Sequence, residues 1–222
     1  MQTNILEYLE RTVRRLPEKI AYTDGTYGLT FREVYGAARS VGSFLAAEGF
    51  YREPVVVYMK KSPDAIAAFF GAVYGGCFYV PFDEEMPKFR AALILENLKP
   101  RAVICDSHTE KTVNSLEFSG RVFRYEEIKT FRQDEAALAS IRSRALDTDP
   151  IYIVFTSGST GVPKGVAACH RSVLDYVENL SEVLGFGEET VFGNQSPLYF
   201  DACLKELYPT MMFGATTYLI PK

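Results

Sequence analysis

Strands and helices alternate regularly between residues 54 and 105, and this alternation constrains the fold more than any other feature of the sequence. Three short runs rich in β-branched and aromatic residues are predicted to be strands, at Pro54–Tyr58, Phe78–Val80 and Ala102–Cys105. The segments between them, Pro63–Tyr74 and Pro87–Leu98, are predicted to be helices. Strands joined through a helix pair in parallel, with the helices on the faces of the sheet. The chain is therefore predicted to have an α/β fold, a parallel-rich layered sheet with flanking helices.

The remaining segments extend this pattern on both sides. Before residue 54, a helix over residues 4–16 should end at Pro17, a strand is predicted at 21–23, and Thr30 and Glu33 form a capping box for a helix that ends at Gly49. Residues 107–149 are more polar and weaker in period, so they are expected to wrap from one layer to the next. The later predicted elements are a strand at 166–168, a helix at 170–184 with Val173, Val177, Leu180 and Leu184 facing inward, a strand at 191–192, a helix at 202–213 and a strand at 215–220.

One segment, residues 65–82, carries no charge and reaches the lower length limit of a transmembrane helix, about 18 residues. Glycines and a proline interrupt it, so it is predicted to be a helix, a turn and a buried strand instead. The first ten residues contain two glutamates rather than a basic start and an apolar core, so no signal peptide is expected. A cytoplasmic protein with no membrane partner is predicted.

Charge and cysteine content argue against several functions. The net charge is −4 and no basic block is present, which argues against a nucleic-acid partner. The four cysteines are widely spaced and form no Cys-x-x-Cys pair, so buried thiols in a reducing compartment are expected. His108 and His170 lie far from any cluster of ligands, so no metal site is predicted.

Residues Thr156–Gly165 have the composition of a phosphate-binding loop. They follow an apolar run, Ile151–Phe155, that is predicted to be a buried strand. Three glycines allow backbone N–H groups to turn toward an anion at close range, while hydroxyls and a lysine add donors and positive charge. The pattern fits neither the common P-loop nor a serine-hydrolase elbow, and the alternative is a solvated Gly/Ser hinge. The candidate ligands for a polyphosphate are Thr156, Ser157, Gly158, Ser159, Thr160, Gly161 and Lys164.

The segment Phe155–Val166 resembles the signature loop of the adenylate-forming enzymes, the superfamily of amino-acid adenylation domains, acyl-CoA synthetases and luciferases. Two upstream segments, Leu29–Val34 and Gly76–Asp83, resemble motifs of the same superfamily in the right order, although the second has two larger residues where small ones are more usual. The resemblance covers essentially the whole chain. It implies that residues 1–222 are the N-terminal portion of the large domain of an AMP-forming ligase, and that the C-terminal, lysine-bearing domain is absent.

Phe200 and Asp201 match the position at which amino-acid-activating members of the superfamily bind the α-ammonium group of the substrate. A carboxylate suits a desolvated ammonium, because burying either charge alone is costly. The match favours an amino acid, D-alanine in the carrier-protein ligases included, over fatty and aromatic acids. The structural alternative is that Asp201 caps the helix predicted to begin beside it. His170 also resembles a family position, but a structural histidine is an equal alternative, and no catalytic residue is assigned.

The reaction that the resemblance implies uses ATP and a carboxylic acid. The carboxylate attacks the α-phosphorus of ATP, pyrophosphate leaves, and the acyl group of the adenylate passes to the phosphopantetheine thiol of a carrier protein. The loop would grip the β- and γ-phosphates and stabilise the departing pyrophosphate. Ligands for adenine, ribose and Mg²⁺, and the lysine that contacts the adenylate, are expected beyond Lys222, so the chain alone is not expected to turn over.

Two further hypotheses stay open at this point. An acyl-CoA or aryl-CoA ligase fragment would use the same chemistry on a different acid, and Asp201 argues against it. A truncated, non-catalytic nucleotide-binding or interaction module is the other hypothesis. In that case, missing sheet neighbours would leave an apolar edge near Thr216–Ile220, through which the chain could self-associate.

Overall fold

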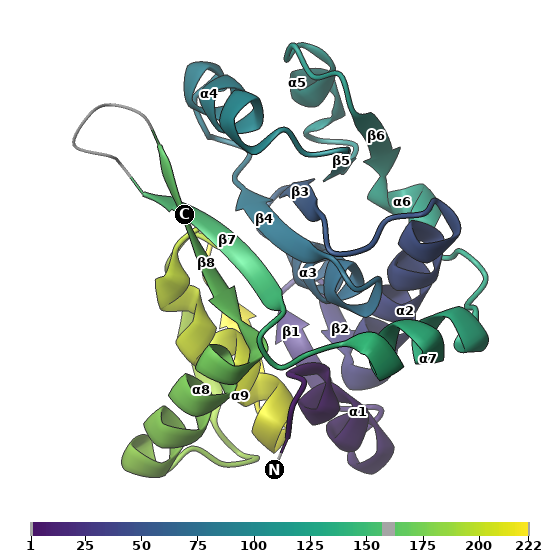
Figure 1. The fold of residues 1–222 in the computed structure, drawn as a ribbon. Helices are drawn as coiled ribbons and strands as arrows, with labels where there is room; N and C mark the ends of the chain where they lie inside the picture. Colours follow the sequence, from purple (N-terminus) through teal and green to yellow (C-terminus); the bar gives the residue numbers. More distant parts are fainter. Residues whose placement is uncertain (1, 157–162, 222) are drawn as a thin grey trace.

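A computed structural model describes residues 2–156 and 163–221 of the chain. The larger sheet consists, in spatial order, of β6 (Arg121–Arg124), β5 (Ala102–Cys105), β3 (Pro54–Tyr58), β4 (Phe78–Phe82), β7 (Pro150–Thr156) and β8 (Lys164–Cys169) (Figure 1). Strand β8 runs antiparallel to β7, whereas all other neighbours in this sheet are parallel. The predicted parallel α/β sheet and its three central strands are therefore confirmed.

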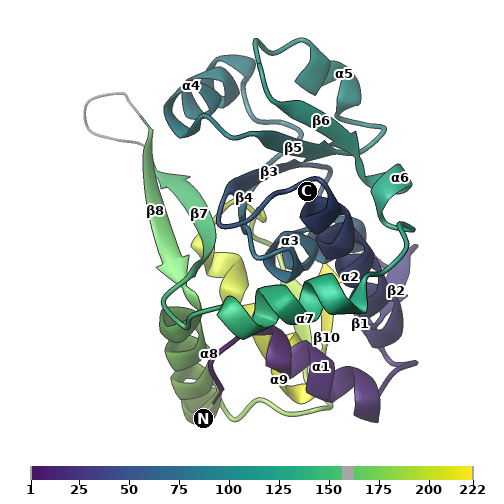
Figure 2. The ribbon, with the colours of Figure 1, turned by 45° about the vertical axis from the view of Figure 1, so that its right-hand side comes forward.

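Alternate residues of β3 point to opposite faces of the larger sheet, and helices cover both faces (Figures 1 and 2). The helices that flank β3, β4 and β5 in the chain are α2 (Phe31–Ala47), α3 (Pro63–Tyr74), α4 (Lys88–Leu98) and α5 (Glu110–Asn114). Val55 and Val57 belong to the apolar core that α2 and α3 share, while Val56 and Tyr58 belong to the core beneath α4 and α5. A sheet buried on both faces produces continuous apolar runs in the sequence, which made these strands recognisable.

The apolar stretch 65–82 is divided between α3 and β4, as predicted. Helix α3 is capped by Ser62, whose Oγ accepts a hydrogen bond from the backbone N–H of Ala65 at 3.2 Å, and it ends at Tyr74 before a glycine turn. Across residues 2–156 and 163–221, no helix combines the length and the apolar character that a membrane span requires.

A second sheet joins segments from both ends of the chain. It consists, in spatial order, of β2 (Gly28–Thr30), β1 (Ile20–Thr23), β10 (Thr216–Leu219) and β9 (Val191–Asn194). Strand β10 pairs in parallel with β1 on one side and with β9 on the other. The prediction of an exposed apolar edge at Thr216–Ile220 is therefore wrong: a neighbour from the N-terminal part of the chain covers that edge, and local pattern does not reveal such a distant partner.

Residues 107–149 add elements rather than only wrapping between layers. They contain α5, β6, α6 (Tyr125–Ile128) and α7 (Glu135–Arg144), and β6 extends the sheet beside β5. Strand β6 has an arginine at each end and only two apolar residues between them. The segment is too short to show the alternating apolar pattern that predicts a strand. One of these residues, Phe123, packs edge-on against Phe44 of α2, with ring centroids 4.9 Å apart.

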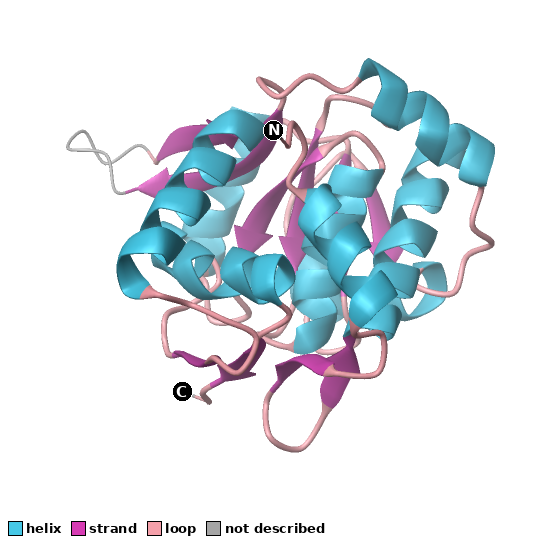
Figure 3. Cartoon of the chain, turned by 90° about the horizontal axis from the view of Figure 1, so that it is seen from below, coloured by secondary structure: helices cyan, strands magenta, loops and turns pink. Residues whose placement is uncertain are grey.

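Helices α1 (Leu6–Arg15), α8 (His170–Leu184) and α9 (Leu204–Phe213) cluster beside the second sheet (Figure 2). In the view from below, helices lie around the strands (Figure 3). The bounds predicted for α8 are confirmed, and Val173 and Val177 are buried as predicted. The inward orientation predicted for Leu184 is wrong. The last turn of α8 extends past the packed part of the helix, so Leu184 is 56% exposed.

The capping box predicted at the start of α2 is present. Thr30 Oγ1 accepts a hydrogen bond from Glu33 N at 3.2 Å, and Glu33 Oε2 accepts one from Thr30 N at 2.8 Å. These two bonds satisfy backbone donors that a helix N-terminus otherwise leaves unpaired. The helix that they open then packs lengthwise against α3.

Helices α2 and α3 approach closely because glycines lie at their contact. A methyl group added to Gly71 of α3 would lie 2.6 Å from Val41 Cβ, and one added to Gly42 of α2 would lie 2.6 Å from Tyr74 Cβ. Both distances are far below a van der Waals contact, so the two backbones are as near as glycine allows. This closely packed pair of helices shares one apolar core with β3 and β4.

Candidate functional site

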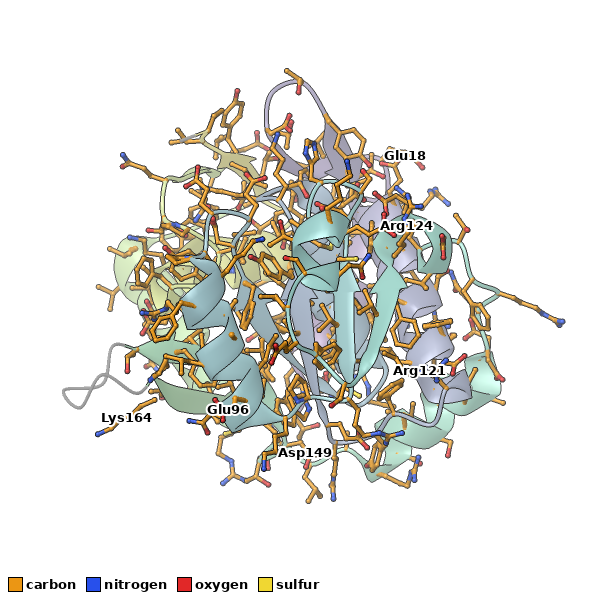
Figure 4. The ribbon with its side chains drawn as sticks, turned by 90° about the horizontal axis from the view of Figure 1, so that it is seen from above. Glu18, Glu96, Arg121, Arg124, Asp149 and Lys164 are labelled. Carbon is orange, nitrogen blue, oxygen red and sulfur yellow. The ribbon has the colours of Figure 1, made fainter. Side chains whose placement is uncertain are left out.

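The candidate phosphate loop connects two antiparallel strands. Thr156 is the last residue of β7 and Lys164 is the first residue of β8, and the two face each other in register. Thr156 Oγ1 donates a hydrogen bond to the Lys164 carbonyl at 3.4 Å. Lys164 is exposed and projects from the outer end of the hairpin (Figure 4). The other candidate ligands lie outside the described residues: Ser157, Gly158, Ser159, Thr160 and Gly161.

A cleft lies at the carboxyl ends of β4 and β7, where open parallel sheets generally bind their ligands. Its volume is about 490 Å³, and it brings Thr156 together with Phe200 and Asp201, which are more than 40 positions away in the sequence. Lys164 does not line this cleft. The described residues that line it are Asp83, Glu85, Met86, Pro87, Arg90, Val154, Phe155, Thr156, Tyr199, Phe200 and Asp201.

Asp201 begins a single 3₁₀ turn, Asp201–Cys203, that leads into α9. Its carboxylate is exposed, and among the described residues it accepts no hydrogen bond at the start of this turn or of α9. The capping alternative therefore finds no support. Asp201 also lines a neighbouring hollow of about 340 Å³ beside Tyr152, so the carboxylate lies where two hollows meet. Burial, followed by the charge of Asp201, raises the pKa of Tyr152 to about 12.

Phe200 occupies the rim of the cleft. Its side chain is 50% exposed and lies against the Tyr199 ring, with centroids 4.7 Å apart. The backbone carbonyl of Phe200 accepts hydrogen bonds from Cys203, from the thiol at 3.0 Å and from the backbone N–H at 3.3 Å. These bonds fix the turn that presents Asp201 to the cleft.

Three charged residues of the cleft were not assigned to the site from the sequence. Asp83 and Glu85 follow β4, and Arg90 lies in the first turn of α4. The side chain of Asp83 is 5% exposed and accepts a hydrogen bond from the backbone N–H of Glu85 at 2.9 Å. The available signal was positional, because residues that follow parallel strands meet at one edge of the sheet.

The sequence pattern of the family described as "AMP-binding enzyme" matches residues 9–222, nearly the whole chain. The chain belongs to the AMP-binding enzyme family. A curated relative, the D-alanine--D-alanyl carrier protein ligase of Staphylococcus aureus (strain Newman), is 32% identical over 220 residues. The match covers 99% of this chain and 43% of the relative, so this AMP-binding family member spans less than half the length of that enzyme.

Solved structures show the same fold. The nonribosomal peptide synthetase FmoA3 with α-methyl-L-serine-AMP bound is 26% identical and superposes with a TM-score of 0.87 over 98% of this chain and 24% of the other. VinN in complex with L-aspartate is 21% identical, with a TM-score of 0.82 over 98% of this chain and 62% of the other. The α/β architecture of the AMP-binding enzymes is thus present in this chain, in agreement with the resemblance stated from its motifs.

His170 has a structural role in this AMP-binding family member. It begins α8, its side chain is 3% exposed, and its Nδ1 accepts a hydrogen bond from the backbone N–H of Ile5 at 3.1 Å. Burial, reinforced by the positive charge of Arg142, lowers the pKa of His170 to about 4. The imidazole is therefore neutral at pH 7 and ties the N-terminal segment to α8.

We expect the depressed pKa of His170 to make the fold sensitive to acid. An unfolded histidine has a pKa of about 6.5, so between that value and the folded value the unfolded state binds more protons, and the free energy of unfolding falls as the pH is lowered. The expected loss between pH 7 and pH 4.5 is about 2 kcal/mol. His170→Asn retains an acceptor for Ile5 but does not titrate, so its urea midpoint should depend less on pH. The matched control is His108→Asn, because His108 is exposed; an unaltered pH dependence in His170→Asn would contradict the assignment.

The cysteines and acidic residues of the described chain form no metal site. Cys77, Cys105 and Cys203 are buried as predicted and Cys169 is half-buried, all as free thiols. Burial raises the pKa of Cys203 to about 12. Within residues 2–156 and 163–221, no group of three His, Cys, Asp or Glu side chains is arranged to hold a metal ion.

Proposed function

We propose that residues 1–222 form the N-terminal portion of the large domain of an AMP-forming ligase that activates an amino acid with ATP. The observation that carries this proposal is the shared cleft: Thr156, at the start of the candidate phosphate loop, and Asp201, the candidate ammonium ligand, line the same 490 Å³ space. An enzyme that joins a carboxylate to the α-phosphorus of ATP requires the two substrates side by side. The cleft contains Thr156, which is suited to the phosphates of ATP, and Asp201, which is suited to the ammonium group of an amino acid.

Each end of the cleft has a distinct task in this proposal. Asp201 pairs with the α-ammonium group and thereby directs the substrate carboxylate toward the β7 end, where Thr156 opens the loop. The loop hydroxyls, its backbone N–H groups and Lys164 neutralise the phosphate charge that accumulates as pyrophosphate leaves. In this scheme the protein supplies position and charge rather than a covalent intermediate. Mg²⁺, when bound, would add positive charge beside the phosphates.

The relatives support the amino-acid class and extend the proposal to a partner. One relative is described as a D-alanine--D-alanyl carrier protein ligase, and the FmoA3 structure contains bound α-methyl-L-serine-AMP. We infer that the product of this protein is likewise an aminoacyl adenylate, and that a carrier-protein thiol accepts the aminoacyl group. Because this chain spans 43% of the carrier-protein ligase, the complete activity is proposed for a full polypeptide of the relative's length, called the full polypeptide below.

Amino-acid-dependent exchange between pyrophosphate and ATP tests the proposed function. The assay uses the full polypeptide with a panel of amino acids, their analogues without the amino group, fatty acids and aromatic acids, and the 222-residue chain serves as a control. We expect exchange with one or a few amino acids and none with the analogues that lack the ammonium group. Exchange driven by fatty or aromatic acids would instead identify an acyl-CoA or aryl-CoA ligase, and ATP binding without exchange for any acid would identify a non-catalytic module.

We expect Lys164→Ala in the full polypeptide to raise the KM for ATP about tenfold, because one charge-assisted contact with a phosphate is worth about 1.5 kcal/mol. The KM for the amino acid should change little, since Lys164 does not line the cleft that contains Asp201. Lys111→Ala on α5 is the matched control, because Lys111 is also an exposed lysine. Equal ATP parameters in the two variants would exclude Lys164 from phosphate binding.

A further inference from the structure

Helix α4 contacts the β7–β8 hairpin at both ends of the candidate phosphate loop. Arg90 Nη2 donates a hydrogen bond to the Phe155 carbonyl at 3.1 Å, and Asn97 Nδ2 donates one to the Pro163 carbonyl at 3.4 Å. Phe155 lies one residue before Thr156, and Pro163 lies one residue before Lys164. The two bonds therefore reach the residue immediately before the candidate loop and a residue near the C-terminal end of that loop.

The two donors lie on one face of α4. Arg90 and Asn97 are seven residues apart, which places them two helical turns apart and about 10 Å along the axis. Between them, Ile94 is fully buried in the core that also includes Val80 of β4, and Phe155 packs against this core. Figures 1 and 2 show α4 close to the β7–β8 hairpin. Because Ile94 anchors this helix to the sheet, the side chains of Arg90 and Asn97 are held within hydrogen-bond distance of the hairpin.

The hairpin needs this support because the sheet provides little at its outer end. Strand β7 pairs in register with β4 only at Tyr152 and Tyr79 among the described residues, whereas β3 pairs with β4 at five positions. Beyond Tyr152, β7 continues to Thr156 with β8 as its partner. On the side of β7 that β4 no longer pairs with, the Phe155 carbonyl accepts a hydrogen bond from Arg90 of α4 instead of from a strand.

We propose that Arg90 and Asn97 are positioning residues that fix the two flanks of the phosphate loop relative to the cleft. This inference rests on the proposed function and deepens it. Arg90 acts from within the cleft and holds the last residues of β7, while Asn97 acts from outside the cleft and holds the entry to β8. Catalysis that depends on the placement of phosphate is sensitive to such support, because a displacement of about 1 Å costs about 100-fold in rate.

Near-isosteric substitutions that remove each donor test the proposal. Arg90→Met retains the aliphatic bulk without a donor, Asn97→Asp replaces the donating NH₂ with oxygen, and Arg90→Lys restores a donor. The control variants are Lys88→Ala and Glu96→Ala, both exposed residues of α4; Figure 4 shows Glu96 on the same side of the molecule as Lys164. The readouts are the KM for ATP and the KM for the amino acid in pyrophosphate exchange by the full polypeptide, and the amide hydrogen exchange of the hairpin in the 222-residue chain.

We expect Arg90→Met and Asn97→Asp each to raise the KM for ATP five- to tenfold, to leave the KM for the amino acid unchanged, and to speed amide exchange in residues 150–169 about fivefold. Arg90→Lys should recover most of both effects. If Arg90→Met raises the KM for ATP while Asn97→Asp changes neither readout, Arg90 is a direct phosphate ligand and the proposal is wrong. The proposal also fails if hairpin amide exchange is unchanged in both variants.

The two readouts separate this proposal from the proposed function. Amide exchange in the hairpin does not depend on turnover, so it tests the support from α4 even if the full polypeptide exchanges no pyrophosphate. Active wild-type protein combined with unchanged variants would reject the role of α4 and leave the proposed function standing. Inactive wild-type protein combined with faster hairpin exchange would reject the proposed function and leave the structural role of α4 standing.

Discussion

Replacing Asp201 with asparagine in the full polypeptide is expected to lower kcat/KM for the amino acid about 100-fold while leaving the KM for ATP within twofold. The substitution retains the shape of the side chain but removes its negative charge. A hydrogen bond to a charged group is worth about 1.5–3 kcal/mol, which corresponds to about 10- to 150-fold. The effect should be near the upper end, because the bound ammonium would remain charged and without a counter-ion in the cleft.

The ammonium group itself provides the discriminating comparison. Any residual exchange with the analogue of the substrate that lacks the amino group should be equal in wild-type protein and in Asp201→Asn. Asp175→Asn on α8 is the matched control, because Asp175 is also an exposed aspartate. An unchanged kcat/KM for the amino acid in Asp201→Asn would remove the main reason for choosing amino acids over other acids.

Stability measurements on the same variant test the competing structural role. Loss of a helix N-cap costs about 1 kcal/mol, whereas Asp201 accepts no hydrogen bond at the start of its 3₁₀ turn or of α9 in the described structure. We therefore expect the urea midpoint of Asp201→Asn to equal that of the wild-type chain. The aspartate was a reasonable cap from the sequence because its type and position fit, but α9 begins at Leu204, two residues later than the predicted start at residue 202.

Local patterns predicted the central sheet correctly because its strands are buried on both faces. The runs at β3, β4 and β5 are continuously apolar, and the helix after each strand ends at a recognisable signal in the sequence. The apolar pattern and the end signals therefore predicted the same boundaries. Strand β6 was missed because an edge strand needs few apolar residues. The neighbours of β10 were also missed. Tyr22 pairs with Thr217, nearly two hundred residues away, and neither segment has a local sequence pattern that indicates this pairing.

The sequence predicted the separate segments of the candidate site but not that they lie together in one cleft. Composition predicted that Thr156–Gly165 is a phosphate loop, and resemblance predicted that Asp201 binds the ammonium group, but neither prediction placed the two segments in one cleft. That placement depends on strand order: β7 lies beside β4, so the segment that contains Asp83 and Arg90 forms a wall of the same cleft. Arg90 in particular donates to a backbone carbonyl, an interaction with no residue-type signature on the acceptor side.

The same substitution, glycine to alanine, is expected to have opposite effects at two positions of the α2–α3 pair. Gly71→Ala places a methyl group 2.6 Å from both Cβ and Cγ1 of Val41 and 3.3 Å from the Ala38 carbonyl oxygen. Val41 is fully buried and its Cβ cannot move away by rotation of the side chain, so the helices must separate. Overpacking of this kind costs about 1–3 kcal/mol, and we expect a net loss of about 2 kcal/mol in the free energy of unfolding of the 222-residue chain.

Gly36→Ala on the same helix pair is the matched control and should stabilise the chain. A methyl group added to Gly36 meets no atom within 4 Å, and Gly36 lies inside α2. Alanine gains about 1 kcal/mol over glycine in a helix interior, because it restricts the unfolded chain more. Urea unfolding at 25 °C should therefore separate the two variants by about 3 kcal/mol, with wild-type protein between them. If Gly71→Ala stabilised the chain as Gly36→Ala is expected to, helix propensity rather than the close approach of Gly71 and Val41 would govern the contact between α2 and α3.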